Sequence, residues 1–170
     1  MALLSILEVP DPRLRQKAEP VPVVDERVRT LMDDMLETMY AAPGIGLAAP
    51  QVGIDRRIIV VDVGPKEEPT PIRLINPEIL ALSDDHAEAE EGCLSLPNQF
   101  APVKRATTVK VRYIDEAGQA QEIDADGLLA RCLQHEIDHL DGILFTDHLS
   151  RLKRDMVMKK LEKQRRQRAG

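Results

Sequence analysis

The sequence predicts an α+β fold, with antiparallel or mixed sheets around a central helix and further helices near both ends of the chain. Strand-like segments dominate the middle and helical segments dominate both ends, an order that favours α+β over regular βαβ units. A length of 170 residues suits one domain that can bury a core. Because aromatic residues make up only 2%, we expect aliphatic side chains and methionine to fill that core.

The first helix is expected within "VPVVDERVRTLMDDMLETMYAAPG", residues 21–44. Asp25 can cap its N-terminus, and the pair Pro43 and Gly44 ends it. Apolar positions recur at the spacing of one helical face, which we expect to be buried. They are Val28, Leu31, Met32, Met35, Leu36 and Met39.

Strands are expected in the middle of the chain at "RRIIVVDV" (56–63), "PIRLINPEIL" (71–80) and "ATTVKVRYID" (106–115). The third segment alternates most cleanly between apolar and polar residues. The turn "EAGQA" then leads to a partner strand around 121–123, whereas "GPKEEPTP" is expected to be a loop.

Two more helices complete the expected fold. The second covers "GLLARCLQHEIDHLDG", which Asp126 can cap and Gly142 closes. The third runs from about Ser150 to near the C-terminus.

The second helix contains "QHEIDHLDG", an H-E-x-x-H pattern. Each residue of an α-helix advances by about 100°, so His139 lies only about 40° from His135 and both imidazoles can point at one metal ion. Glu136 lies about 100° round, too far to be a natural ligand but near enough to reach a water molecule at the metal. The alternative is a chance match on a solvated helix face.

A catalytic metal site needs a third protein ligand and an open position. Phe145, where related patterns place a third histidine, cannot bind a metal. Glu162 lies in a basic run, His86 in the acidic and mobile-looking stretch "SDDHAEAEE", and His148 near the start of the last helix. Cys93, within "EEGCLSLP", is a better ligand once ionised.

Cys132 precedes His135 by three residues and could face the same way. If it also bound, the site would be a closed Cys2His2 structural centre and Glu136 would have no role. The spacing is not that of a zinc finger, and a domain of this size does not need a metal to fold. We therefore interpret Cys132 as a small apolar core residue and take Cys93, His135 and His139 as ligands.

The segment "GIGLAAPQVG", residues 44–53, looks like the dinucleotide fingerprint G-x-G-x-x-A. That fingerprint must follow a strand and open a helix. Here a helix precedes it, and Pro50 lies where the following helix would need its first turns. We expect instead a close-packed loop whose backbone approaches a substrate, with the Gln51 amide able to donate to a developing oxyanion. The alternative is a plain connection with an exposed glutamine.

The three segments "GIGLAAPQVG", "EGCLSLP" and "QHEIDHLDG", in this order, resemble the peptide deformylases of the bacterial type. The resemblance extends from "VPDPRLR" to the last helix. It implies that Cys93, His135 and His139 bind the metal and that Glu136 is the general base and acid. It also implies that Gln51 and the backbone N–H of Leu94 stabilise the oxyanion.

The same resemblance implies hydrolysis of the N-formyl group from N-formylmethionine on new polypeptides, with release of formate. It implies one Fe2+ per chain, with Zn2+, Ni2+ or Co2+ as substitutes. The methionine side chain needs an apolar pocket, for which we expect Gly44, Ile45, Gly46, Leu128 and Cys132. Phe100 departs from members of the family that carry a basic residue there. A zinc peptidase and a metal-stapled interaction module are the rival hypotheses.

The tail is strongly basic. From Arg151 onward, nine Lys or Arg stand against Asp155 and Glu162, a net charge of +7 that leaves −13 for the preceding residues of a chain with net charge −6. We expect residues 1–148 to form a single catalytic metallohydrolase domain and 149–170 a basic helix packed on it or extending from it. A weak apolar stripe could dock this helix: Leu152, Met156, Val157 and Leu161.

The basic tail has two interpretations, a solvated helix end or a contact with the ribosome, where nascent chains appear. Low aromatic content argues against base stacking on single-stranded nucleic acid. We also expect no sequence-specific nucleic acid partner. The start "MALLSILEVPDPR" has a short apolar run without a basic flank, so we expect neither a signal peptide nor a membrane contact. Two cysteines do not suggest a secreted scaffold, and we expect a cytoplasmic protein.

Overall fold

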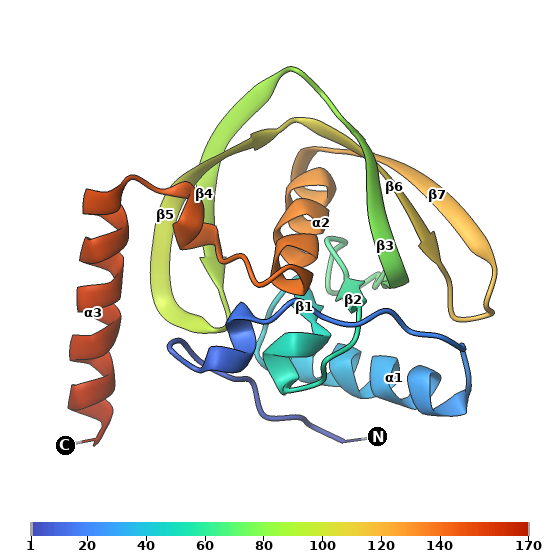
Figure 1. Cartoon of the computed structure of the whole chain (residues 1–170), viewed down its shortest axis with the longest axis horizontal. Helices are drawn as coiled ribbons and strands as arrows, with labels where there is room; N and C mark the ends of the chain where they lie inside the picture. Colours follow the sequence, from blue (N-terminus) through green and yellow to red (C-terminus); the bar gives the residue numbers. More distant parts are fainter. Residues whose placement is uncertain (1, 170) are drawn as a thin grey trace.

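In the computed structural model, which describes residues 2–169, two antiparallel sheets surround the central helix α2 (Gly127–Leu140) (Figure 1). The larger sheet has the order β1 (Gly46–Ala48), β2 (Ile58–Val61), β3 (Ile72–Leu82), β6 (Thr108–Ile114), β7 (Ala120–Asp126). The smaller pairs β4 (His86–Cys93) with β5 (Leu96–Ala106). The expected α+β class is confirmed, and both sheets are antiparallel throughout.

One end of the larger sheet lies between two helices. In β2, Ile59 and Val61 pack with α2, whereas Ile58 and Val60 pack with α1 (Glu26–Ala41). A strand that is buried on both faces is a continuous apolar run, which explains why "IIVV" shows no alternation. As expected, the Asp25 side chain caps α1, accepting from the Val28 N–H at 3.1 Å. Met32, Met35, Leu36 and Met39 are buried, and Val28 and Leu31 partly so.

The ends of α2 fit the expectation only in part. Asp126 precedes the helix, but its side chain makes no capping hydrogen bond. It still belongs to β7, paired with Thr108, and Gly127 turns the chain at a φ of 54°. At the other end, Gly142 has a φ of 75°, and a Cβ there would lie 2.4 Å from the Arg15 carbonyl oxygen. Glycine is therefore required where the helix was expected to close.

The prediction of a mobile acidic stretch around His86 was wrong, because this segment forms β4. Among its eight residues only Glu91 is buried, so the strand lacks apolar alternation of its own. Its order comes from pairing with β5, for example Glu88 opposite Lys104. Alternate β5 residues do face the core, at Ala101, Val103 and Arg105.

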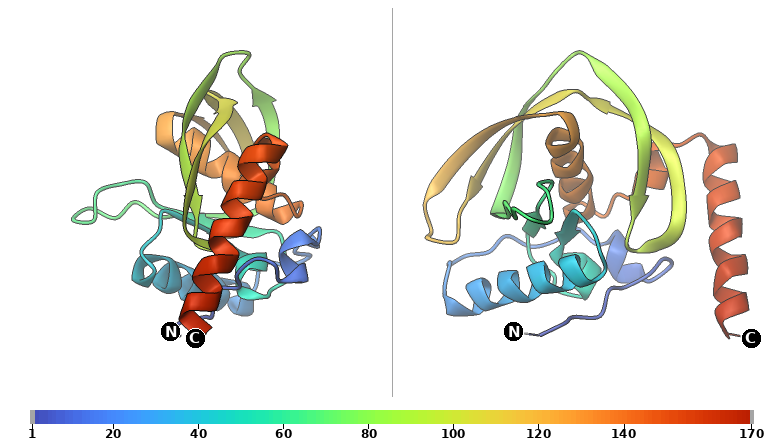
Figure 2. Two further views of the ribbon diagram at one scale, coloured as in Figure 1. Left: turned by 90° about the vertical axis from the view of Figure 1, so that its left-hand side faces the viewer. Right: turned by 180° about the vertical axis from the view of Figure 1, so that it is seen from behind.

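Helix α3 (Arg151–Ala169) lies along one side of the molecule next to β5 (Figures 1 and 2). It docks through the buried Val157 and Leu161, whereas Leu152 and Met156 are 72% and 50% exposed. The expected stripe was wrong in this respect, because Leu152 and Met156 are centred about 140° round the helix from Val157 and Leu161, and only one face of the helix meets the body. No helix within residues 2–169 is long and apolar enough to cross a bilayer.

Candidate metal centre and pocket

Three candidate ligands meet where the end of β4 approaches α2. Ligand atoms of Cys93, His135 and His139 all lie within 4.8 Å of one another. The Nε2 atoms of the two histidines are 3.2 Å apart, and Cys93 Sγ is 3.3 Å from His139 Nε2. Phe145, which cannot bind a metal, instead stacks on His135 with ring centroids 6.2 Å apart.

The charge environment fits a cation at this point. His135 Nδ1 lies 2.9 Å from Glu91 Oε1, and donation to a carboxylate leaves the Nε2 lone pair free for a metal. Burial lowers the pKa of His139 well below its usual value, with His135 acting in the same direction. Burial also disfavours charge on His135, but the nearby carboxylates and Cys93 outweigh it and raise that pKa. A metal ion and a proton would therefore compete for His135.

Glu91 is a residue that the sequence interpretation did not single out. Burial alone would raise its pKa, but hydrogen bonds with His135 and Arg105 outweigh burial and lower the pKa to about 2. It is therefore an ionised carboxylate that can hold the His135 ring in one orientation. One sequence pattern could have found it: Glu91 lies two residues before Cys93, and such positions share a face of an extended strand.

Glu136 lies beside the three donors without being one of them. It is 5% exposed, and within the described residues its Oε1 atom has no hydrogen-bond partner. Burial raises its pKa to about 7, although His135 and Arg105 oppose the shift. A buried carboxylate that titrates near neutral pH is suited to accept and return a proton.

Because Gly46 has no side chain, Glu136 can occupy the space next to it. A Cβ at this position would lie 2.5 Å from Glu136 Oε2 and 2.8 Å from Cys132 Sγ. The segment around it is not the simple loop that we expected: Gly46 opens β1, and a 3-10 helix, Ala49–Val52, follows. Pro50 lies within that short helix, so the dinucleotide-binding alternative has no following α-helix to open.

Gln51 is buried, which excludes the alternative of an exposed glutamine. Its Oε1 accepts from the Ala48 N–H at 2.9 Å, so its Nε2 must face the other way. There Nε2 lies 3.1 Å from Ser95 Oγ and 3.5 Å from Cys93 Sγ. The amide donor is therefore held beside the candidate metal ligands.

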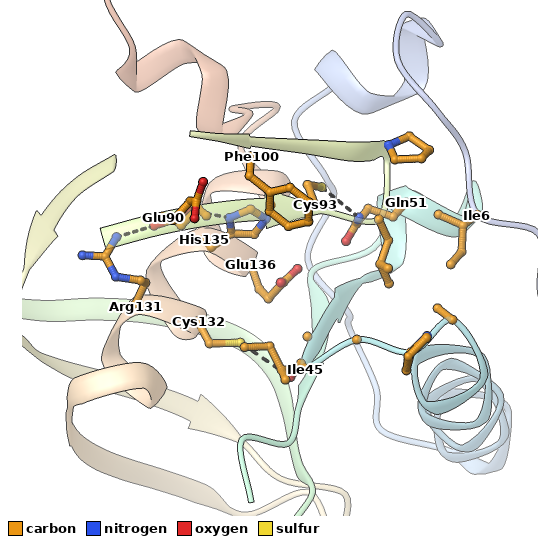
Figure 3. Close-up of a pocket in the computed structure, with 18 of the residues that line it drawn as sticks. Ile6, Ile45, Gln51, Glu90, Cys93, Phe100, Arg131, Cys132, His135 and Glu136 are labelled. Carbon is orange, nitrogen blue, oxygen red and sulfur yellow. Dashed lines mark hydrogen bonds and ion pairs between the residues drawn. The ribbon is translucent and has the colours of Figure 1, made fainter. Parts of the chain in front are cut away.

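These side chains open onto one pocket of about 690 Å³ (Figure 3). All the expected pocket residues line it, namely Gly44, Ile45, Gly46, Leu128 and Cys132, as do Gln51, Cys93, Leu94, His135 and Glu136. Three apolar side chains at its lining are 43–62% exposed: Ile45, Leu128 and Phe100. The lining also includes residues absent from the sequence interpretation, among them Ile6, Glu90 and Arg131.

Cys132 lines the pocket but does not join the group of donors found in residues 2–169. Its Sγ lies 3.6 Å from the Ile45 carbonyl oxygen, and burial raises its pKa well above the usual value. A thiol that resists ionisation is a poor metal ligand, so the geometry favours an open three-donor site over a closed Cys2His2 centre.

Comparisons with known proteins agree with the resemblance. The profile of the family described as "Polypeptide deformylase" matches residues 3–155. The peptide deformylase of Agrobacterium fabrum is 56% identical over 164 residues, covering 96% of both chains. That of Phenylobacterium zucineum is also 56% identical over 164 residues, covering 96% of this chain and 97% of the other.

Solved structures extend the likeness to the fold. The crystal structure of peptide deformylase from Ehrlichia chaffeensis superposes with a TM-score of 0.94 at 43% identity, covering 99% of both chains. A structure of peptide deformylase from that organism in complex with actinonin has a TM-score of 0.92 at 46% identity, covering 96% of this chain and 98% of the other. Because sequence and structure agree over nearly the whole length, the chain belongs to the polypeptide deformylase family of hydrolases.

Proposed function

We propose that this chain hydrolyses the formyl amide of N-formylmethionine at the start of newly made polypeptides, and that the reaction depends on a metal. One thiol and two imidazoles lie together beside the buried carboxylate of Glu136, whose Oε1 atom has no hydrogen-bond partner within residues 2–169, and this arrangement carries the proposal. We assign Cys93, His135 and His139 as the ligands of one ion, Fe2+ by family resemblance, with Zn2+, Ni2+ or Co2+ as substitutes. Bound there, a divalent ion supplies Lewis acidity to the formyl oxygen and to water.

Glu136 moves the proton in this mechanism. Its carboxylate takes a proton from the attacking water as the water oxygen bonds to the formyl carbon. It then gives this proton to the amine nitrogen as the C–N bond breaks, releasing formate and a free N-terminus. A pKa near 7 allows the group both to accept and to release the proton at neutral pH.

Two donors from the chain stabilise the negative oxygen that forms during attack. We assign Gln51 Nε2, which the Ala48 N–H orients, and the backbone N–H of Leu94, which follows directly after the ligand Cys93. A well-placed donor of this kind lowers the barrier by roughly 3 kcal/mol.

The pocket beside the proposed metal centre is suited to the methionine side chain of the substrate. We propose that its apolar part, built by Ile45, Leu128 and Cys132 with Gly44 and Gly46, takes the unbranched thioether side chain. Within the part of the chain that the structure describes, β1 pairs only with β2 and β4 only with β5, so both are edge strands, and residues of both line the pocket. An extended peptide can pair its main chain with such an edge.

The basic helix is proposed to bring the enzyme to its substrate. We treat residues 1–148 as the catalytic unit and 149–170 as a helix that contacts ribosomal phosphate with the exposed lysines and arginines of α3. No membrane partner and no sequence-specific nucleic acid is needed, and the site of action is the cytoplasm, where nascent chains emerge.

An anaerobic assay with three peptides tests the activity. The iron-loaded protein is given formyl-Met-Ala-Ser, acetyl-Met-Ala-Ser and unmodified Met-Ala-Ser, and formate and new amines are measured. We expect one formate per amine from the formyl peptide and no turnover of the other two. Cleavage of a Met–Ala bond in the unmodified peptide would instead indicate a peptidase.

A further inference from the structure

The proposed metal ligands lie on two elements that share no sheet. Cys93 ends β4 in the β4–β5 hairpin, whereas His135 and His139 project from α2. Metal–ligand distances tolerate deviations of only about 0.2 Å. Contacts between the hairpin and α2 must therefore fix where the thiol lies relative to the imidazoles.

Arg131 makes contacts of this kind. It lies on α2 one turn before His135 and is only 12% exposed. Its guanidinium donates to Glu91 Oε2 at 2.6 Å, to the Val103 carbonyl at 2.9 Å and to the Ala87 carbonyl at 2.8 Å. Ala87 and Glu91 lie on β4 and Val103 on β5, so one side chain of α2 holds both strands of the hairpin.

The direction of the side chain argues against a role in substrate binding. Arg131 lines the edge of the pocket, yet Figure 3 shows its guanidinium turned toward the strand that carries Glu90 and away from Glu136. Its contacts are with the hairpin, and none of its hydrogen bonds goes to another side chain of the pocket apart from Glu91. It therefore shapes the site through the strand that it holds.

Arg131 also belongs to a cluster of buried charged side chains. It consists of Glu91, Asp138, Arg105 and Arg131: Arg105 binds both carboxylates at 2.5–2.9 Å, and Arg131 binds Glu91 at 2.6 Å. All four side chains are at most 20% exposed. Two imidazoles border the cluster, His135 at Glu91 and His148 at Asp138. Removing Arg131 would take one of two guanidinium partners from the Glu91 carboxylate that holds His135, and loss of one partner from a buried charge cluster destabilises the contacts around it.

We propose that Arg131 is a positioning residue that fixes the β4–β5 hairpin against α2 and thereby holds the Cys93 thiol in place relative to the two imidazoles. This inference rests on the metal centre proposed above. Its consequence is a metal that leaves slowly, because loss of an outer partner of a ligand typically weakens metal binding by about 10- to 100-fold.

Cobalt provides the test, since thiolate-bound Co2+ absorbs visible and near-ultraviolet light. Wild type, Arg131→Met, Arg131→Lys and Arg112→Met are loaded with Co2+, and its loss to excess EDTA is followed through the absorption bands. Arg112 on β6 serves as the matched control, because its ion pair with Glu78 on β3 is exposed and involves neither the β4–β5 hairpin nor α2. Circular dichroism melts of the same samples report the fold.

We expect Arg131→Met to release Co2+ at least ~10-fold faster than wild type, with shifted bands that report altered ligand geometry. Arg131→Lys should fall between the two, because an ammonium keeps the charge but cannot span Glu91 and both carbonyls. Arg112→Met should match wild type. If Arg131→Met does not fold, the rate of Co2+ release and the absorption bands of Arg131→Lys are compared with those of wild type instead.

Release within about twofold of wild type and unchanged bands would overturn the proposal, even if the melting temperature fell, since Arg131 would then be a structural staple only. If wild type itself shows no thiolate-to-cobalt band, the proposed metal centre fails instead, and this inference with it.

Discussion

Replacing Glu136 by glutamine should make the metal-free protein more stable and the loaded enzyme nearly inactive. The carboxyl group is buried, one oxygen has no partner among the described residues, and its pKa is raised from 4.5 to about 7 by burial. One pKa unit corresponds to about 1.4 kcal/mol. The ionised carboxylate therefore lowers the free energy of unfolding by about 3 kcal/mol, as an order of magnitude.

The sign of the pH dependence follows from the raised pKa. Below pH 4.5 Glu136 is protonated in both the folded and the unfolded chain, so its burial as an ion costs nothing. Between pH 4.5 and about 7 the unfolded chain ionises first, and the folded state loses stability as pH rises. Above about pH 7 Glu136 is ionised in both states, and the folded chain carries the full cost of the buried charge. Glutamine does not ionise, so the variant should lack this loss.

Urea unfolding of metal-free protein at pH 5 and pH 8 measures the effect. The stability gain of Glu136→Gln should be larger at pH 8 by an amount of the order of 3 kcal/mol, whereas Glu88→Gln, an exposed carboxylate on β4, should show no such gain. With metal bound, turnover of a formyl peptide should fall at least ~10²-fold. Equal stability of the two proteins at pH 8, or near-normal turnover by the loaded variant, would refute the reasoning.

Three more predictions concern the ligands, the glycine beside the base, and the tail. Cys93→Ser should lose its metal while Cys132→Ser keeps it, as metal analysis of anaerobically purified protein would show; loss in Cys132→Ser would restore the closed-site alternative. Gly46→Ala should reduce kcat by as much as ~10²-fold with an intact circular dichroism spectrum, because the added Cβ would meet the Glu136 carboxylate and Cys132 Sγ. A normal kcat would show that the position of Glu136 does not depend on the glycine. Replacing the exposed α3 residues Lys159, Lys160 and Lys163 by glutamine should weaken co-sedimentation with ribosomes at low salt and leave hydrolysis of a short formyl peptide unchanged. If wild type and variant pellet equally, the tail has another role.

Much of the site was predictable because local geometry determines it. The period of the helix alone puts His135 and His139 on one face with Glu136 beside them, and the structure has this arrangement. The apolar spacing of α1 and the cap at Asp25 were likewise readable from neighbouring residues.

Contacts between distant segments were not predictable. β4 is an acidic and mostly exposed strand whose order depends on β5, so no local pattern marks it. The same holds for Arg131, which looks like a solvated helix residue until the hairpin supplies Glu91 and two carbonyls. The docking face of α3 also depends on which side meets β5, and the sequence stripe did not separate Val157 from Met156.

Removal and return of the metal test the central claim most directly. The iron-loaded protein is stripped with a chelator under anaerobic conditions, and formate release and far-ultraviolet circular dichroism are measured before stripping, after it, and after Fe2+ is added back. An open catalytic centre predicts that formate release falls at least ~10²-fold, that the spectrum of a folded α+β protein persists, and that Fe2+ restores activity. Unfolding of the stripped protein, or formate release that continues without metal, would contradict the account.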